Sequence, residues 1–223
     1  MANYEVDSEK LKPYLPYKTE FELWNSTCFV SLVGFMFLNT KVMGVKIPFH
    51  INFEEVNLRF YVRYNENNIW KRGVVFIKEI VPKPALTFVA NALYNENYET
   101  LYMLHNWEIN SENLFVEYKW KKNKKWNSIS VQTGKQLIEI AEGSQEKFIT
   151  DHYWGYAKIN DKKTSEYGVE HPEWQVYKTI DYFIDTNFDD VYGKEFSFLT
   201  NKKPESVFLA EGSEIKVKSG RTL

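Results

Sequence analysis

A regular alternation of apolar and polar residues runs through EEVNLRFYVRY, residues 54–64. In an extended chain successive side chains point to opposite faces, so this segment has one apolar face and one polar face. The apolar face holds Val56, Leu58, Phe60 and Val62, and the polar face holds Glu55, Asn57, Arg59, Tyr61 and Arg63. The segment therefore predicts a β-strand with its apolar side in a core.

Other segments predict neighbours for that strand. Residues 28–38, CFVSLVGFMFL, are apolar on both alternating faces, as in a central strand. GVVFIKEIV, residues 73–81, predicts the next strand, and residues 113–132 predict a hairpin. Two or three strands are expected near the end of the chain, including EIKVKSG. Aromatic residues favour strands, and they make up 17% of the chain.

A few short helices complete the prediction. Asp7 can cap a helix over SEKLKPYL, and Ser144 can cap another through Phe148 and Ile149. PALTFVANALYNENY begins with Pro84, which suits a first turn, and carries an apolar stripe at helical spacing. We predict a mostly β (α+β) fold: a curved antiparallel sheet or barrel with a few short helices.

The chain totals limit the class of protein. The 223 residues contain no linker, low-complexity tract or repeat, which predicts a single domain over residues 1–223. Cys28 is the one cysteine, so no intramolecular disulfide can form. MANYEVDSEK shows no signal peptide and residues 28–38 are too short to cross a bilayer, so we expect a cytoplasmic protein without a membrane partner. A net charge of −2 argues against a nucleic-acid partner.

Residues 148–174 hold two of the four histidines among five tyrosines and tryptophans. The segment predicts a β-hairpin. With its turn centred between Asp161 and Lys162, His152 lies directly opposite His171, close enough for the two imidazoles to share a ligand. The aromatic residues on the same side of the hairpin are then Trp154, Tyr156 and Tyr167.

Two interpretations of this hairpin stay open. It is a pocket wall whose histidines transfer protons or hydrogen-bond a ligand, or a half-buried aromatic hairpin with histidines at its edge. In the same register Gly155 faces Gly168, which leaves a gap that a ring or helix could fill. Glu170 points to the other face, so no metal site is predicted.

The polar face of residues 54–64 also has two interpretations. Alternating polar residues normally face solvent. Inside a barrel, however, Asn57, Arg59 and Tyr61 would fix a carboxylate, because an arginine is always charged and binds carboxylates with two parallel hydrogen bonds. Lys78 and Lys83 are the weaker candidates for a reactive amine, which requires that the lysine be desolvated.

Several stretches together resemble the YqjF-like family of uncharacterised bacterial proteins. They are DSEKLKPYLP, FEEVNLRFYV followed by RGVVFIKEI, HYWGYA, VEHPEW and VFLAEGSEIKV, which span nearly the whole chain. That family resembles the acetoacetate decarboxylase superfamily, which implies a β-barrel or cone around a central cavity. The decarboxylases use a lysine that forms a Schiff base, activated by an adjacent lysine.

In VPKPAL, Lys83 is the nearest counterpart of that lysine, and Pro84 stands where the second lysine is expected. The essential glutamate of the decarboxylases falls near KVMGVKIP, which has no acid, and their N-terminal arginine has no counterpart before Asp7. The resemblance therefore implies the fold and leaves open whether the chain is an enzyme.

We predict a protein whose central cavity binds a small organic acid or aromatic molecule without a cofactor or metal. The expected ligand-binding residues are Asn57, Arg59, Tyr61, His152, Trp154, Tyr156, Tyr167 and His171. One alternative is a Schiff-base lyase or decarboxylase for a keto acid, with Lys83 or Lys78 as the amine. Another is a non-catalytic scaffold or interaction protein with a filled barrel. Whether the chain forms a homodimer stays open.

Overall fold

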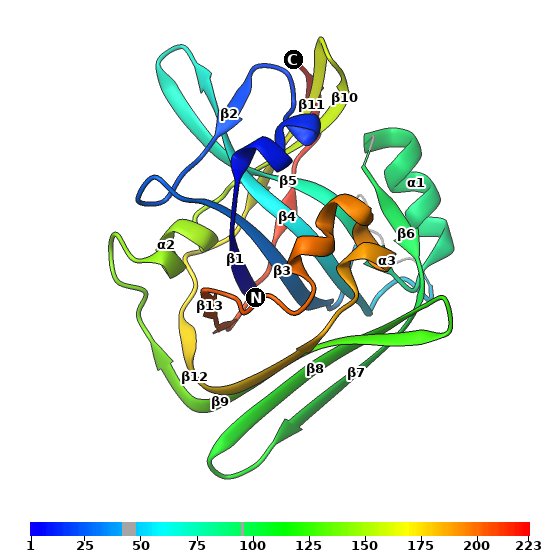
Figure 1. Cartoon of the computed structure of the whole chain (residues 1–223), viewed down its shortest axis with the longest axis vertical. Coiled ribbons are helices and arrows are strands. Elements are labelled where there is room, and N and C mark those ends of the chain that lie inside the picture. The colour runs from blue at the N-terminus through cyan, green and yellow to red at the C-terminus, as the bar shows by residue number, and fades with distance from the viewer. Residues whose placement is uncertain (42–47, 95) are drawn as a thin grey trace.

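The computed structural model of the chain describes residues 1–41, 48–94 and 96–223 (Figure 1). Its first sheet contains eleven of the described strands. The main path runs through β13 (Ser206–Val207), β1 (Ala2–Val6), β3 (Cys28–Phe37), β4 (Phe53–Glu66), β5 (Ile69–Val81), β10 (Trp154–Asn160), β11 (Lys163–Glu170) and β15 (Lys216–Val217). Three short strands pair beside this path: β2 (Thr19–Phe21) with β4, β6 (Tyr98–Thr100) with β5, and β16 (Arg221–Thr222) with β11.

A second sheet of five strands lies at the lower side of Figure 1. Its order is β14 (Leu209–Ala210), β12 (Val176–Asp185), β9 (Lys125–Ile138), β8 (Asn113–Lys122) and β7 (Tyr102–Ile109). The predicted hairpin over residues 113–132 is confirmed, since β8 and β9 pair on either side of Asn123 and Lys124. Both turn residues have positive φ, as a tight hairpin turn requires.

The helices are short, as predicted. They are α1 (Pro84–Tyr94), α2 (Gln145–Thr150), α3 (Phe188–Tyr192) and the 3-10 turns η1 (Ser8–Lys10), η2 (Lys12–Tyr14) and η3 (Lys194–Leu199). Ser144 caps α2 by accepting a hydrogen bond from the Lys147 amide, as expected. Asp7 also acts as a cap, but residues 8–15 form two 3-10 turns in place of one helix, because Pro13 lacks the amide proton needed to continue the first.

Two parts of the predicted architecture are wrong. Neither sheet closes into a barrel among the described strands, because each path ends at an edge strand. The first sheet is also mixed, since β5 pairs in parallel with both β6 and β10. Parallel neighbours need a crossover connection, and between β5 and β6 the chain crosses over through α1. A mostly β fold with few helices is confirmed.

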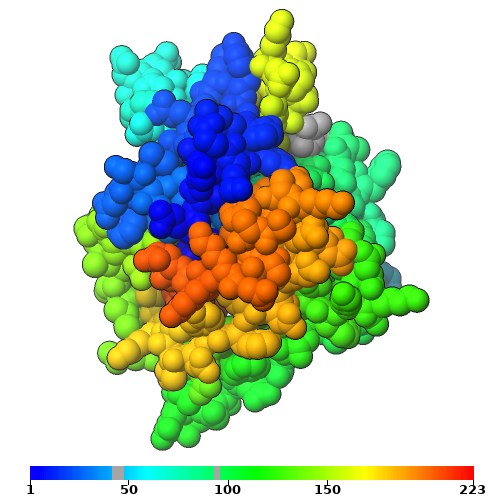
Figure 2. Space-filling view, in the orientation of Figure 1, coloured from blue at the N-terminus to red at the C-terminus, as the bar shows by residue number. Residues whose placement is uncertain are grey.

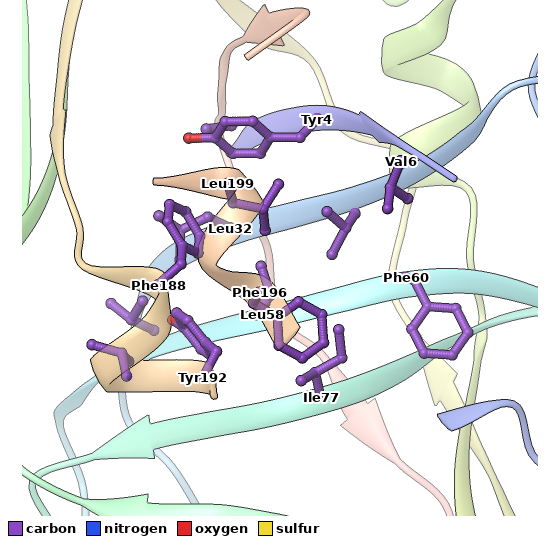
Figure 3. Packing of buried hydrophobic residues seen from close by; sticks show 14 of the residues in the cluster. Tyr4, Val6, Leu32, Leu58, Phe60, Ile77, Phe188, Tyr192, Phe196 and Leu199 are labelled. Atoms are coloured by element: carbon purple, nitrogen blue, oxygen red, sulfur yellow. The ribbon is translucent and has the colours of Figure 1, made fainter. Parts of the chain in front are cut away.

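The apolar face of the first sheet packs against α3 and η3. Figure 3 shows Phe188, Tyr192, Phe196 and Leu199 from this segment lying over Leu32, Leu58 and Ile77 of the sheet. Residues of the second sheet join the same cluster, including the fully buried Trp120. Figure 2 shows the N-terminal segment lying beside the segment around residues 185–210, where β1 pairs with β13.

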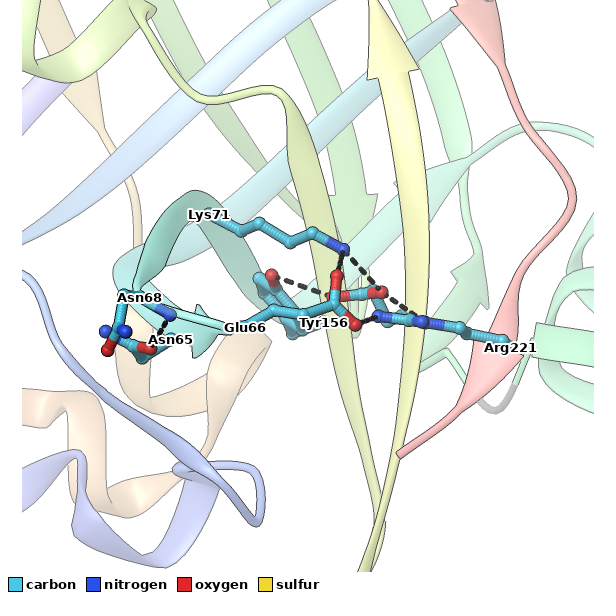
Figure 4. A network of polar contacts seen from close by, with 7 residues as sticks. Asn65, Glu66, Asn68, Lys71, Tyr156 and Arg221 are labelled. Atoms are coloured by element: carbon cyan, nitrogen blue, oxygen red, sulfur yellow. Dashed lines mark hydrogen bonds and ion pairs between the residues drawn. The ribbon is translucent and has the colours of Figure 1, made fainter.

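A polar network around the buried Glu166 holds β16 on this face of the sheet (Figure 4). Glu166 of β11 is 1% exposed and accepts hydrogen bonds from the Tyr156 hydroxyl at 3.1 Å and from Arg221 Nε at 2.7 Å. Lys71 and Arg221 also form ion pairs with Glu66 of β4. These contacts fix β16 against the β10–β11 hairpin.

Candidate functional site

The polar face of β4 is largely buried between Glu55 and Tyr61. Glu55, Asn57 and Tyr61 are 2%, 1% and 0% exposed, while Arg59 is partly exposed. A small second apolar cluster covers one end of this face, where Tyr61 packs with Phe148 of α2. The alternation in residues 54–64 thus gives a strand with two buried faces, one apolar and one polar.

Neighbouring strands add polar groups to the same face. Asn57 of β4 pairs with Glu79 of β5, and Glu79 pairs with Tyr98 of β6. Directly paired residues share a face of the sheet, so the three side chains form a row across three strands. Glu79 is 3% exposed.

Hydrogen bonds join this row to two further acids. Asn57 Nδ2 donates to Glu55 Oε1 at 2.9 Å, and the Tyr98 hydroxyl donates to Glu55 Oε2 at 3.2 Å. The Tyr167 hydroxyl donates to Glu96 Oε1 at 2.9 Å. We call this group the acid cluster, with the members Glu55, Asn57, Glu79, Glu96, Tyr98 and Tyr167.

Burial changes the protonation of the three glutamates. It raises the pKa of Glu55 to about 7, against the opposing effects of the Asn57 and Tyr98 hydrogen bonds and of Arg59. It also raises the pKa of Glu96 to about 7, assisted by the charge of Glu55. The pKa of Glu79 lies well above its ordinary value, because of burial and then of the neighbouring Glu96 and Glu55. Carboxyl groups that stay neutral near pH 7 can donate hydrogen bonds or protons.

Arg59 lies beside this cluster on the same face of β4. Its Nε atom is buried and has no hydrogen-bond partner among the described residues. Its Nη2 atom lies 3.8 Å from Met1 Sδ, and its guanidinium carbon lies 5.9 Å from the centre of the Tyr61 ring. The positive charge of Arg59 acts on Glu55 on one side and on His152 on the other.

The predicted pairing of His152 with His171 is wrong. The turn lies where it was expected, since Asn160 pairs with Lys163, but an irregularity between Lys158 and Asn160 shifts the register by one residue. A β-bulge inserts one residue into one strand, and a shift of one residue moves every side chain beyond it to the other face.

The two histidines consequently lie in different environments. His152 is buried, with Nε2 2.9 Å from Glu22 Oε2 and its ring 4.7 Å from the Tyr61 ring. Burial lowers the pKa of His152 despite the opposing effect of Glu22. His171 is partly exposed and stacks between Tyr153 and Trp174, at ring distances of 4.6 and 4.5 Å.

The shifted register also separates the predicted aromatic wall. Trp154 pairs with Gly168 and Tyr156 with Glu166, so both rings lie on the other face of the sheet from Tyr167. Tyr167 pairs with Gly155, and a Cβ atom at that glycine would lie 2.2 Å from Cζ of the tyrosine ring. The predicted pairing of Gly155 with Gly168 is thus wrong, although a ring does lie directly against the Gly155 backbone as expected, and it is the ring of Tyr167.

The two candidate lysines do not join the acid cluster. Lys78 pairs with Leu58, on the apolar face of β4, and its amine lies 3.0 Å from Glu99 Oε2 and 2.5 Å from the Val191 carbonyl. Lys83 lies at the start of α1, where its carbonyl accepts a hydrogen bond from the Thr87 amide. Of the residues predicted for the site, the structure brings together Asn57, Arg59, Tyr61, His152 and Tyr167 on the polar face.

Glu79, Glu96 and Tyr98 were not predicted. Glu79 carried a usable signal, because it is the one acid of β5 and lies on the face opposite Lys78. Within residues 1–41, 48–94 and 96–223, no three His, Cys, Asp or Glu side chains are arranged to hold a metal ion. No helix of those residues has the length and apolar character needed to span a membrane.

Sequence comparison identifies one family for nearly the whole chain. The profile of the DUF2071 family, described as an uncharacterized conserved protein, matches residues 1–214. No curated protein matches the chain in sequence.

Solved structures with the same fold are distant in sequence. The enduracididine biosynthesis enzyme MppR with bound HEPES buffer is 12% identical, with a TM-score of 0.68 over 100% of this chain and 84% of that chain. MppR complexed with pyruvate is 10% identical, with a TM-score of 0.66 over 99% of this chain and 86% of that chain. Acetoacetate decarboxylase from Legionella pneumophila is 10% identical, with a TM-score of 0.60 over 100% of this chain and 82% of that chain. The expected similarity to the acetoacetate decarboxylase fold is confirmed, and at these identities it concerns the fold alone.

Proposed function

The chain belongs to the DUF2071 family, and we propose that it binds a small organic anion through Arg59 on the buried polar face of β4. The observation that carries this proposal is the buried Arg59 Nε, which has no partner among the described residues. A buried donor without a partner costs about 1–3 kcal/mol, so a carboxylate or carbonyl oxygen that accepts its hydrogen bond is favoured.

The chemistry around Arg59 supports an oxygen-rich ligand. Arginine binds carboxylates by charge-assisted hydrogen bonds, and the neutral acids nearby can donate further bonds to a carbonyl oxygen. MppR, which shares this fold, has been solved in complex with pyruvate, and another protein of this fold is an acetoacetate decarboxylase. Small oxo acids and other short carboxylic acids are therefore the first ligands to test.

Replacement of Arg59 by Met is expected to abolish the response to these acids. In a thermal-shift assay with pyruvate, acetoacetate and benzoate, an acid that binds the wild type raises its melting temperature. Loss of the guanidinium removes a charge-assisted interaction of about 1.5–3 kcal/mol, which weakens binding roughly 10- to 100-fold.

Arg63→Met provides a matched control. Arg63 is also a partly exposed arginine of β4, but its Nε already donates to Glu20 Oε1 at 2.6 Å. This variant is expected to respond to the acids as the wild type does. The proposal is wrong if Arg59→Met and Arg63→Met respond alike, or if no acid shifts the wild type.

A Schiff-base lyase is the second candidate, and the decarboxylase of the same fold is what favours it. Such a reaction needs a free, neutral amine close to the bound acid. The Lys78 amine is held by Glu99 on the opposite face of the sheet, so Lys83 is the candidate left for this role. We expect borohydride treatment in the presence of pyruvate to leave both lysines unmodified. Mass spectrometry that finds a reduced adduct on Lys83 would favour the lyase over simple binding.

A further inference from the structure

The polar face of β4 holds unpartnered atoms of two opposite kinds. Asn57 Oδ1 and Glu79 Oε2 are buried and have no hydrogen-bond partner among the described residues, and an amide oxygen is an acceptor. Arg59 Nε is also buried and unpartnered, and it is a donor. A ligand that satisfies Asn57 Oδ1, an ionised Glu79 and Arg59 Nε together presents donors at one end and an acceptor at the other.

The site has an acceptor end, formed by Asn57 and Glu79, and a donor end, formed by Arg59. The geometry of the strand sets the distance between these two ends. Asn57 and Arg59 are successive residues on one face of β4, so their Cα atoms lie about 6.6 Å apart. Glu79 lies directly across from Asn57 on β5. The acceptor end therefore lies one residue pair away from the donor end, a separation that a short molecule can span.

The charges of the site agree with a separation into an acceptor end and a donor end. Three glutamates gather at the acceptor end, and among the described residues Arg59 is the one cation that lowers the pKa of any of them, acting on Glu55. A cationic group of a ligand placed there would let one of these carboxyl groups ionise, because it would supply the missing opposite charge. The guanidinium of Arg59 meanwhile attracts an anion.

From these observations we infer that the ligand is a small zwitterion of the amino-acid class. Its carboxylate binds Arg59, and its ammonium group donates hydrogen bonds to Asn57 Oδ1 and Glu79. This inference rests on the proposed anion binding at Arg59 and adds the chemical class of the ligand. Ordered water on the same acceptors is the competing explanation, and it predicts no preference for an amine.

Isothermal titration calorimetry on the full chain can test the inference with matched pairs of ligands. Each pair differs only in the amine: glycine and acetate, β-alanine and propionate, γ-aminobutyrate and butyrate. Three chain lengths are used because the two ends of the site are separated along the strand. At least one amino acid is expected to bind about tenfold or more tightly than its partner without the amine.

Two variants test whether Glu79 binds the ammonium group of the ligand. Glu79→Gln keeps the shape of the side chain and removes its charge, so it is expected to lose the preference for the amino acid while the simple acid still binds. Glu54→Gln is the matched control, since Glu54 neighbours Glu55 on β4 but lies on the opposite face beside His105. It is expected to keep the wild-type preference.

The possible results separate the two proposals. Equal affinity for both members of every pair would overturn the zwitterion and leave anion binding intact. No binding by any acid or amino acid would overturn the anion site as well. Propylamine binding as tightly as β-alanine would show that Arg59 contributes nothing, which contradicts both. A preference that survives in Glu79→Gln would also overturn the inference, because Glu79 would then not receive the amine.

Discussion

The Gly155→Ala variant is expected to lose about 3 kcal/mol of unfolding free energy, because overpacking in a filled interior typically costs 1–3 kcal/mol and occasionally more. The new methyl group would lie 2.2 Å from the Tyr167 ring, far inside contact distance. Tyr167 is held on its other side by its hydrogen bond to Glu96. Urea denaturation followed by tryptophan fluorescence measures this loss.

Gly134→Ala is the control for that experiment. Gly134 lies in a strand of the second sheet, and no atom lies within 4 Å of the position its Cβ would take. Its unfolding free energy is expected to change by no more than about 0.5 kcal/mol. Equal losses in the two variants would mean that the Tyr167 ring does not lie against Gly155.

The free energy of unfolding is expected to fall as the pH rises from about 5 to above 7. In the unfolded chain a glutamate loses its proton near 4.5, whereas Glu55 and Glu96 keep theirs in the folded protein until about 7. Between these values the folded state binds more protons than the unfolded state, so each rise in pH favours unfolding. The three carboxyl groups together contribute on the order of several kcal/mol to this fall, while the buried Met1 amino group and His152, whose pKa values burial lowers, oppose it over part of the same range.

Glu79→Gln isolates one contribution to this pH dependence. The amide cannot ionise, so at pH 8 the variant is expected to be more stable than the wild type by roughly 1–3 kcal/mol. At pH 5, where Glu79 is neutral, the two should be similar. Chemical denaturation at both pH values measures the difference.

Glu99→Gln should change stability in the opposite direction at pH 8. Partial burial raises the pKa of Glu99, but its ion pairs with Lys122 and Lys78 outweigh this effect and lower the pKa overall. Removal of its charge therefore removes a favourable interaction. A gain in stability for both variants would mean that removal of any carboxylate charge stabilises the protein, so the gain in Glu79→Gln could not be assigned to the acid cluster.

The sequence pattern was sufficient for the central strands but not for how the elements pack together. Alternation over residues 54–64 predicts β4 and places Arg59 beside Asn57 on one face. It leaves open whether that face meets water, because α2, which covers part of it, lies some 90 residues further along the chain. Burial of a polar face depends on such distant elements.

The error in the hairpin has a local cause. The turn around Asp161 lies where the sequence predicts it. The register beyond the turn depends on the irregularity between Lys158 and Asn160, which the residues of the turn do not predict. A single displaced residue was enough to send His152 to Glu22 and His171 to the surface. The acid cluster was missed for a related reason, since Tyr98 reaches Glu79 through a parallel strand pair that spacing along the chain does not reveal.

The pairing of β1 with β13 affects how the protein is made. Ala2 lies opposite Val207, so β1 receives one of its two neighbours only after some two hundred further residues have left the ribosome. Closing so long a loop is entropically costly and slows folding. During translation one edge of β1 therefore stays uncovered, and a nascent chain of this protein should depend on chaperones until that partner emerges.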